Sequence, residues 1–304
     1  MEEFTLRGVE FPEGYVAVID KPYEWTSADV VRKIKFQLRK CGYPKIKIGH
    51  AGTLDPLATG ILLVCIGRAT KQVEALQAEE KEYVAELMLG ATTPSGDMEH
   101  EVDNTYPTEH ITREMVEEAL KSLTGEREQL PPLYSAKKVQ GVRAYEFARA
   151  GEEIELKKAL VNIYELELLE YDMPRIKIRV RCSKGTYIRT LCKDIGQALG
   201  CGGCMAALRR VQAGEYTADM AVSLETLIAA ENPEEYLQNV DTIFLKHPAV
   251  TLTAKQALRC RNGNAFSIDL PEGTYRAYDE NGEFLMLAKV DSGVMSTIKS
   301  FFGV

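Results

Sequence analysis

The residues best suited to chemistry in this sequence lie in one glycine-punctuated block, residues 49–60. The block reads Gly-His-Ala-Gly-Thr-Leu-Asp-Pro-Leu-Ala-Thr-Gly and places a single carboxylate, Asp55, just before the apolar run 61–66. A carboxylate beside a buried strand needs a partner or a chemical role, such as that of a nucleophile, and glycines let a ligand approach closely. The alternative is structural, with Asp55 as a helix N-cap and Pro56 as the first helical residue. Spacing alone does not decide between the two.

Further polar residues in apolar or glycine-rich settings could complete a site with this carboxylate. They are Lys21, His50, Tyr83, Tyr187 and Arg189, and the apolar Leu208 follows them. Each also has an ordinary structural interpretation. A buried tyrosine is commonly a core aromatic with one satisfied hydroxyl, and Leu208 is most simply a core residue. Taken singly, none of these residues identifies a function.

Several common chemistries have no motif in the sequence. There is no glycine-rich phosphate loop, no dinucleotide fingerprint and no His-Glu-x-x-His, and the four histidines form no triad pattern. The pair Cys201 and Cys204 has metal-ligand spacing, but no second pair completes a zinc site. The motifs therefore give no support for a zinc site or a dinucleotide cofactor.

Apolar spacing predicts the elements that must position the candidate residues. Residues 16–19 and 61–66 read as buried strands, 83–89 as a strand, and 188–199 as a helix that Gly200 ends. Thr26 and Thr112 are expected to cap helices. The strand 176–182 alternates cleanly, which predicts a core on one face and positive charge from Lys177, Arg179 and Arg181 on the other. The polar stretch around Pro233 resembles a linker, and short strands with turn signals follow Pro248.

Composition indicates a globular protein of the reducing cytosol. The chain has 304 residues, enough for one large and one small domain. Its longest apolar run is six residues, too short to span a bilayer, and the acidic N-terminus does not resemble a signal peptide. Seven irregularly spaced cysteines are typical of free thiols. We expect a cytoplasmic protein with no membrane association.

The net charge of −8 argues against nonspecific nucleic-acid binding, but the charges are segregated along the chain. Residues 1–71 carry net +3, residues 72–130 net −11 and residues 131–215 net +5. This pattern could leave a basic cleft on an acidic body, which would suit a polyanionic ligand. An ordinary mixed surface is the alternative.

Considered together, the candidate residues resemble a known family. The block 49–60 resembles the catalytic motif of the bacterial TruB-type tRNA pseudouridine synthases, and five further blocks match in order. These are Asp20–Ser27, Lys81–Tyr83, Pro131–Glu146, Cys182–Arg189 and Leu208–Arg210. The resemblance covers about residues 12–245. Chance agreement over that many ordered blocks is negligible.

The resemblance implies an α+β fold. A central mixed, largely antiparallel sheet flanked by helices would form the pseudouridine-synthase fold. The catalytic domain would span residues 1–245, with an RNA-binding insert at about 105–155. Residues 248–304 would form a small β-rich, PUA-like C-terminal domain of slightly acidic charge.

The resemblance also implies the activity, which is isomerisation of the uridine at tRNA position 55, in the T-loop, to pseudouridine. Asp55 would be the catalytic carboxylate, and Arg189 would pair with it and keep it ionised. Tyr83 would stack on the base near the proton lost from C5. His50 and Tyr187 would line the pocket, with Leu208 packed behind it. Lys21 matches as support near the site.

The chemistry needs a carboxylate but no cofactor. The glycosidic bond breaks, the uracil turns while held, and C5 rejoins C1′. The carboxylate could attack C6 or C1′, or help remove the 2′ proton in a glycal route. The substrate is the T-arm of tRNA, and we expect a monomer with no obligate protein partner. Two other functions stay open: a tRNA-folding chaperone, and a synthase acting on another RNA uridine.

Two segments depart from the family pattern. Glu24 stands where the family usually has glycine, which puts the local turn in doubt. The segment Thr92–Asp97 replaces a more acidic version, and the sequence assigns it no role.

Overall fold

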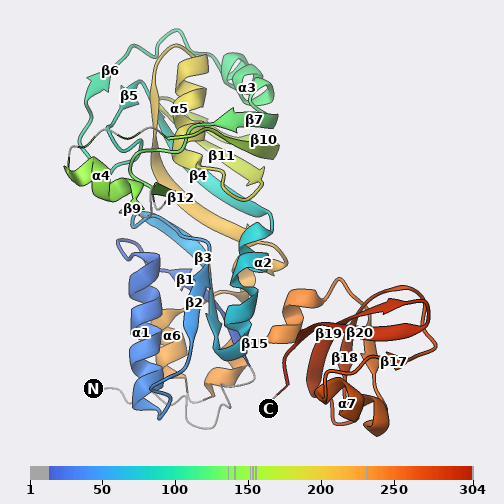
Figure 1. Cartoon of the computed structure of the whole chain (residues 1–304). Helices are drawn as coiled ribbons and strands as arrows, with labels where there is room; N and C mark the ends of the chain where they lie inside the picture. The colour runs from blue at the N-terminus through green and yellow to red at the C-terminus, as the bar shows by residue number, and fades with distance from the viewer. Residues whose placement is uncertain are drawn as a thin grey trace.

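The computed structural model describes residues 14–135, 137–139, 142–150, 152, 154, 156–230 and 232–302. Most of this part of the chain is built on an eleven-stranded mixed sheet, whose main path runs β14-β1-β3-β12-β4-β11-β10-β7. Three short strands, β2, β13 and β15, pair with β3, β12 and β1. A separate five-stranded sheet lies near the C-terminus. The mixed, largely antiparallel central sheet with flanking helices agrees with the predicted fold class (Figure 1).

One half of the central sheet is covered on both faces. It contains β1 (Tyr15–Lys21), β2 (Ile48–Ala51) and β3 (Ala58–Ile66). Helix α1 (Ser27–Lys40) packs against one face, and α2 (Val73–Ala78) packs against the other. Both faces of β3 are therefore buried, which explains why residues 61–66 are apolar without alternation. The predicted cap is confirmed, because Thr26 and Asp29 form a capping box at the start of α1.

The other half of the sheet has helices on one face only. It contains β4 (Lys81–Leu89), β7 (Gly125–Gln129), β10 (Ala159–Asp172) and β11 (Arg175–Cys182). Helices α3 (Arg113–Ser122) and α5 (Ile188–Ala198) pack on it and form one hydrophobic core. Thr112 caps α3 as predicted, by accepting a hydrogen bond from the Met115 N–H.

The opposite face of that half is not the positively charged surface that the sequence predicted. Its cations pair with glutamates: Arg181 with Glu80 and Glu165, Arg179 with Glu82 and Glu167, Lys177 with Glu170, and Arg175 with Glu86. The glutamates come from β4, from the residue just before it, and from β10, which flank β11. The prediction considered one strand in isolation and was wrong for this reason. The face carries mixed charge.

Strand β12 (Gly203–Ala213) joins the two halves, because it runs parallel to β3 and antiparallel to β4. Gly60 makes this approach possible. A Cβ atom at Gly60 would lie 2.2 Å from the Arg210 carbonyl oxygen, and the residue has a φ of 93°. The sequence interpretation that this glycine admits a ligand is therefore wrong, because the neighbouring strand occupies the space.

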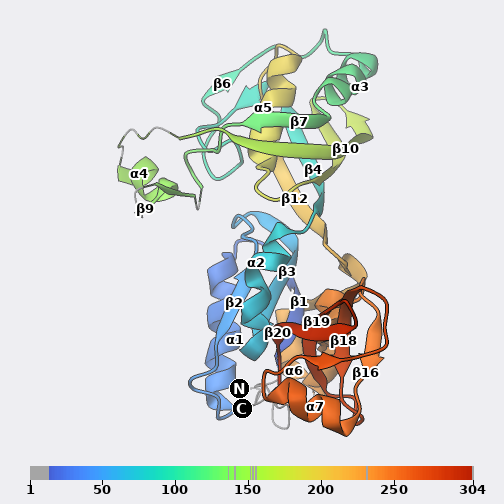
Figure 2. The ribbon, with the colours of Figure 1, turned by 45° about the vertical axis from the view of Figure 1, so that its right-hand side comes forward.

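The C-terminal sheet has the order β16-β18-β19-β20-β17 and packs with helix α7 (Ala254–Arg261). Its strands are β16 (Ala249–Thr251), β17 (Phe266–Ser267), β18 (Gly273–Tyr278), β19 (Phe284–Asp291) and β20 (Val294–Ser300). Two views place it beside the half of the body that carries β1 (Figures 1 and 2). Phe244, Phe284 and Phe301 form the aromatic contact between the two parts.

The remaining elements connect these parts. The short helices are α4 (Ala144–Ala150), α6 (Leu224–Ala229), η2 (Gly67–Gln72), η3 (Ala218–Met220), η4 (Pro233–Tyr236) and η5 (Val240–Phe244). The short strands are β5 (Ala91–Thr92), β6 (Asn104–Thr105), β8 (Lys138–Val139), β9 (Val142–Arg143), β13 (Tyr216–Thr217), β14 (Val222–Ser223) and β15 (Leu237–Asn239). The stretch after Pro233 is not a simple linker, because β15 pairs with β1.

In the described part of the chain, no helix is both long and apolar enough to cross a membrane.

Candidate active site

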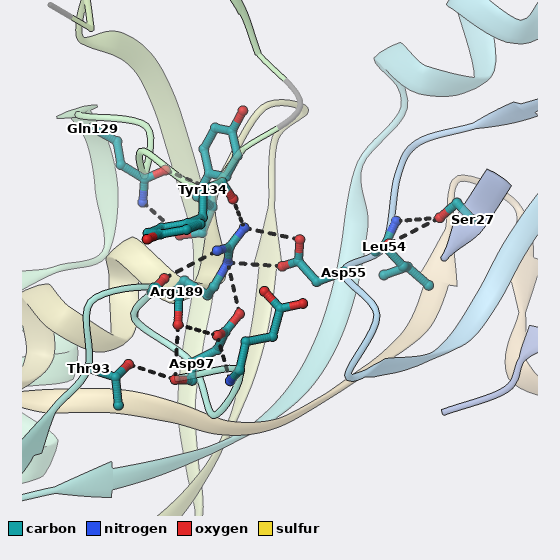
Figure 3. Close-up of polar contacts among 11 residues, drawn as sticks. Ser27, Leu54, Asp55, Thr93, Asp97, Gln129, Tyr134 and Arg189 are labelled. Carbon is teal, nitrogen blue, oxygen red and sulfur yellow. Dashed lines mark hydrogen bonds and ion pairs between the residues drawn. The ribbon is translucent and has the colours of Figure 1, made fainter. Parts of the chain in front are cut away.

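Asp55 lies on a turn between β2 and β3, and no helix follows it. The Asp55 carbonyl accepts a hydrogen bond from the Ala58 N–H at 3.1 Å, and β3 begins at Ala58. The helix-cap alternative is therefore wrong. The Ser27 hydroxyl, at the start of α1, fixes the preceding residue by bonding both the N–H and the carbonyl of Leu54 (Figure 3). The loop thus holds Asp55 in place from α1.

Arg189, in the first turn of α5, holds the Asp55 carboxylate with two donors. Its Nη2 donates to Oδ1 at 3.0 Å, and its Nε lies 3.0 Å from Oδ2. This two-point geometry orients the carboxylate as well as binding it. The side chain of Arg189 is only 4% exposed, whereas that of Asp55 is 32% exposed. The carboxylate therefore faces open space with its inner side tied to the arginine.

The same guanidinium connects two loops to Asp55. Its Nη1 donates to the Ser95 carbonyl at 3.2 Å, and its Nη2 donates to the Tyr134 carbonyl at 2.7 Å. Figure 3 shows Arg189 lying among Asp55, Asp97 and Tyr134. The side chain of Arg189 thereby holds together three segments that are distant in sequence.

Asp97 is a second carboxylate at this site, and sequence reasoning missed it. Its Oδ2 lies 3.5 Å from Arg189 Nε, and its Oδ1 accepts hydrogen bonds from the Ser95 hydroxyl and the Glu99 N–H. Asp97 is 1% exposed. In the sequence, the segment Thr92–Asp97 stood out only as a departure from the family pattern. The feature that could have identified Asp97 is an acidic residue directly after the turn-forming stretch Thr-Thr-Pro-Ser-Gly.

The charges around Asp55 act in opposite directions on its pKa. Burial raises the pKa of Asp55, the Arg189 and Lys21 charges oppose that rise, and the Asp97 charge adds to it. The net pKa is above the ordinary value. The sequence predicted the pairing with Arg189 correctly but did not anticipate that desolvation would outweigh it.

A pocket of about 630 Å³ opens beside Asp55 and Arg189. Three of the predicted residues, Tyr83, Tyr187 and Leu208, line it with them. Its cationic lining residues are Lys81, Lys137, Lys184, Arg189 and Arg210, and its only carboxylate among the described lining residues is Asp55. A basic pocket on an acidic chain agrees with the cleft that the segregated charges suggested.

The two tyrosines come from different elements. Tyr83 is on β4 and Leu208 on the neighbouring β12, so both project from the sheet. Tyr187 is the residue before α5, and the Gln129 amide bonds both its N–H and its carbonyl. Burial raises the pKa of both tyrosines, so their phenols stay protonated near neutral pH.

His50 and Lys21 are not among the residues that line this pocket. His50 lies on β2, opposite Val64 of β3. Lys21 is 1% exposed, and its ammonium group donates to the carbonyls of Pro22, Trp25 and Pro56. Burial lowers the pKa of Lys21 to about 8. Its contact with Pro56 supports the loop immediately after Asp55.

The turn that contains Glu24 forms despite the missing glycine. Glu24 has a φ of 64°, in the left-handed region that glycine adopts at little cost. The local turn is therefore kept, because Glu24 adopts the backbone conformation that the family's glycine would have.

The described residues contain no group of three or more His, Cys, Asp or Glu side chains placed to hold a metal ion.

Comparison with known proteins matches this chain to two family models. Residues 38–188 match the N-terminal domain of the TruB family of pseudouridylate synthases, and residues 189–242 match the tRNA pseudouridylate synthase B C-terminal domain. A tRNA pseudouridine synthase B of Parabacteroides distasonis is 57% identical over 72% of this chain and 94% of its own length. The enzyme of the same name from Francisella tularensis subsp. novicida is 40% identical over 94% of each chain.

Solved structures agree on the fold. A chain from an H/ACA RNP bound to a substrate RNA containing 2′-deoxyuridine has a TM-score of 0.70 and 22% identity, covering 100% of this chain and 94% of that one. A chain from a Cbf5-Nop10-Gar1 complex has a TM-score of 0.69 and 24% identity, covering 95% and 85%. These likenesses show the fold, and the family models with the close relatives show the family. The chain belongs to the TruB family of pseudouridylate synthases.

Proposed function

We propose that this protein isomerises the uridine at position 55 of the tRNA T-loop to pseudouridine, with Asp55 as its catalytic carboxylate. The tRNA position and the residue number agree by coincidence. One observation carries the assignment: a carboxylate held at 3.0 Å by a buried arginine at the side of an aromatic-lined basic pocket. Membership of the family and the names of the close relatives support the reaction class and the tRNA substrate.

The pocket has the parts that this isomerisation requires. The uracil must leave its stack to be reached, and aromatic side chains suit a base that has been flipped out. Tyr83 and Leu208 project from adjacent strands and provide the surfaces between which the base is held. Asp55 presents its exposed side to the nucleotide, while Arg189 fixes its orientation. The reaction is an internal rearrangement, so these groups need no redox partner.

The charges of the pocket suit RNA rather than a neutral ligand. Lys137 and Lys184 lie on its lining, on a chain of net charge −8. Phosphate contacts of this kind position an RNA loop, while the aromatic pocket selects the displaced base. We propose tRNA as the partner, the single chain as the acting unit, and the cytoplasm as its location.

An RNA-folding chaperone is the principal alternative, and the geometry at Asp55 argues against it as the sole function. A chaperone has no need for a partly desolvated carboxylate oriented by two arginine donors. The pKa of Asp55 is raised by its surroundings, so this arrangement costs stability that RNA binding alone would not require.

The experiment that tests the substrate is pseudouridine mapping in tRNA from a strain that lacks the gene. We expect position 55 to remain uridine there, to be modified after complementation with the wild-type gene, and to stay unmodified with Asp55→Asn. If the strain instead lacks pseudouridine at a different RNA uridine, while position 55 of tRNA is still modified, the reaction type is supported but the proposed substrate is refuted.

A further inference from the structure

Arg210 is a buried cation that the proposed chemistry leaves without a role. It lies on β12, beside the pocket, and is 1% exposed. No carboxylate among the described residues lies within ion-pair distance of it, whereas its neighbour Arg209 pairs with Asp20 at 2.8 Å. Burying a guanidinium without a carboxylate is costly, so its hydrogen bonds need an explanation.

Those hydrogen bonds bracket the Asp55 loop. Arg210 Nε donates to the Ile61 carbonyl at 2.7 Å, and Nη2 donates to the Gly52 carbonyl at 3.1 Å. Gly52 and Ile61 lie on either side of Asp55 in sequence. One planar group therefore ties the start of the loop, at Gly52, to β3, into which the loop leads. A guanidinium provides this geometry and a lysine does not.

The glycines of the loop are explained by the same residue. A Cβ atom at Gly52 would lie 3.3 Å from Arg210 Nη1, and one at Gly60 would meet the Arg210 backbone. Both glycines have a φ of 93°. At these two glycines the loop thus fits closely around Arg210.

Arg210 also adjoins a tyrosine that lines the same pocket. It pairs with Tyr83 in the register between β12 and β4, and both side chains line the pocket. The residue that closes the Asp55 loop is therefore also the strand neighbour of the tyrosine. During the proposed isomerisation the uracil must turn in the space between Asp55 and Tyr83.

We propose that Arg210 is a positioning residue for the isomerisation, whose guanidinium clamps the loop 52–61 and so sets the spacing between Asp55 and Tyr83. The inference rests on the proposed function for its kinetic consequence. Reacting groups that are misplaced by about 1 Å lose about 10²-fold in rate, so a loosened clamp slows the chemical step. Binding of the RNA outside the pocket does not depend on the clamp.

The test compares Arg210→Lys with the wild type in single-turnover tritium release from a T-arm stem-loop labelled at C5 of the target uridine. Lysine keeps the charge but cannot hold both carbonyls in one plane, so we expect the rate to fall by about 10²-fold with RNA affinity little changed. Arg179→Met, an exposed site on the opposite sheet face, should match the wild type. An unchanged rate in Arg210→Lys, or an equal loss of rate and affinity, overturns the proposal.

Hydrogen exchange tests the clamp without relying on activity. Amides in residues 52–61 should exchange faster in Arg210→Lys than in the wild type, while those of α3 stay the same. Unchanged exchange in the loop overturns the clamp, whereas a wild-type protein that releases no tritium overturns the proposed function instead. If Arg210→Lys does not fold, Arg210→Gln provides the same comparison, because its amide keeps a donor but lacks the two-pronged guanidinium.

Discussion

Replacing Arg189 with methionine separates its effect on the carboxylate from any role in RNA binding. Methionine keeps much of the side-chain length but removes the donors to Asp55, to Asp97 and to two carbonyl oxygens. We expect the rate of isomerisation to fall much more than RNA affinity, because the guanidinium acts on Asp55 rather than on phosphate.

The size of the loss follows from the two bonds to Asp55. Hydrogen bonds to a charged group contribute about 1.5–3 kcal/mol each. The Asp55 side chain is 32% exposed, so water replaces part of what is lost, and the lower end applies. The two bonds together then contribute about 3 kcal/mol to holding the carboxylate in its reactive orientation. If the transition state needs all of that orienting energy, its loss corresponds to about 10²-fold in rate.

The pH dependence of the rate distinguishes more clearly whether Arg189 acts on Asp55 or on RNA. The Arg189 charge lowers the pKa of Asp55, so its removal raises that pKa further above the ordinary value. If the ionised carboxylate is the active form, the acid limb of the rate profile moves to higher pH, and the loss is larger in acid than in alkali. The assay is single-turnover tritium release from about pH 5 to about pH 9, with Arg179→Met as the control. A loss that is uniform across this range and matched by lost RNA affinity would refute the reasoning and make Arg189 a phosphate anchor.

Three further substitutions test neighbouring features. Asp97→Asn removes a negative charge that raises the pKa of Asp55, so the acid limb should move to lower pH; a shift to higher pH would contradict this. Gly60→Ala should lower the free energy of unfolding by about 3 kcal/mol in urea denaturation, because the added Cβ meets the Arg210 backbone and the residue has a positive φ. A loss below about 1 kcal/mol would contradict this by showing that β3 and β12 separate easily. Glu24→Gly should raise the free energy of unfolding by about 0.5 kcal/mol, because glycine removes the strain of a left-handed glutamate but has more conformational entropy in the unfolded chain. A decrease in the free energy of unfolding would contradict the strain at φ 64°.

The sequence predicted the elements whose signals are local. The capping box at Thr26 and the buried run 61–66 depend on neighbouring residues alone, and both are present. The alternating strand 176–182 was also correct, but the charge of its outer face depended on β4 and β10, which no single strand reveals. Pairing of this kind is a property of the folded sheet.

The sequence predicted those site residues whose side-chain chemistry and motif identify them. It did not predict a residue whose role depends on contacts with segments distant in sequence. Asp55, Tyr83, Tyr187, Arg189 and Leu208 were found from the ordered blocks and line one pocket. The role of Arg210 needs the carbonyls of Gly52 and Ile61, which lie about 150 residues away. Such main-chain contacts leave no signal in a single sequence.

The central claim, that Asp55 is the catalytic carboxylate, is tested most directly by Asp55→Asn in the same tritium-release assay. Asparagine keeps the shape of the side chain and an oxygen that can accept a bond from Arg189, so the variant should fold and bind the T-arm stem-loop as the wild type does. We predict no tritium release above background from the bound RNA. Release at the wild-type rate would contradict the account.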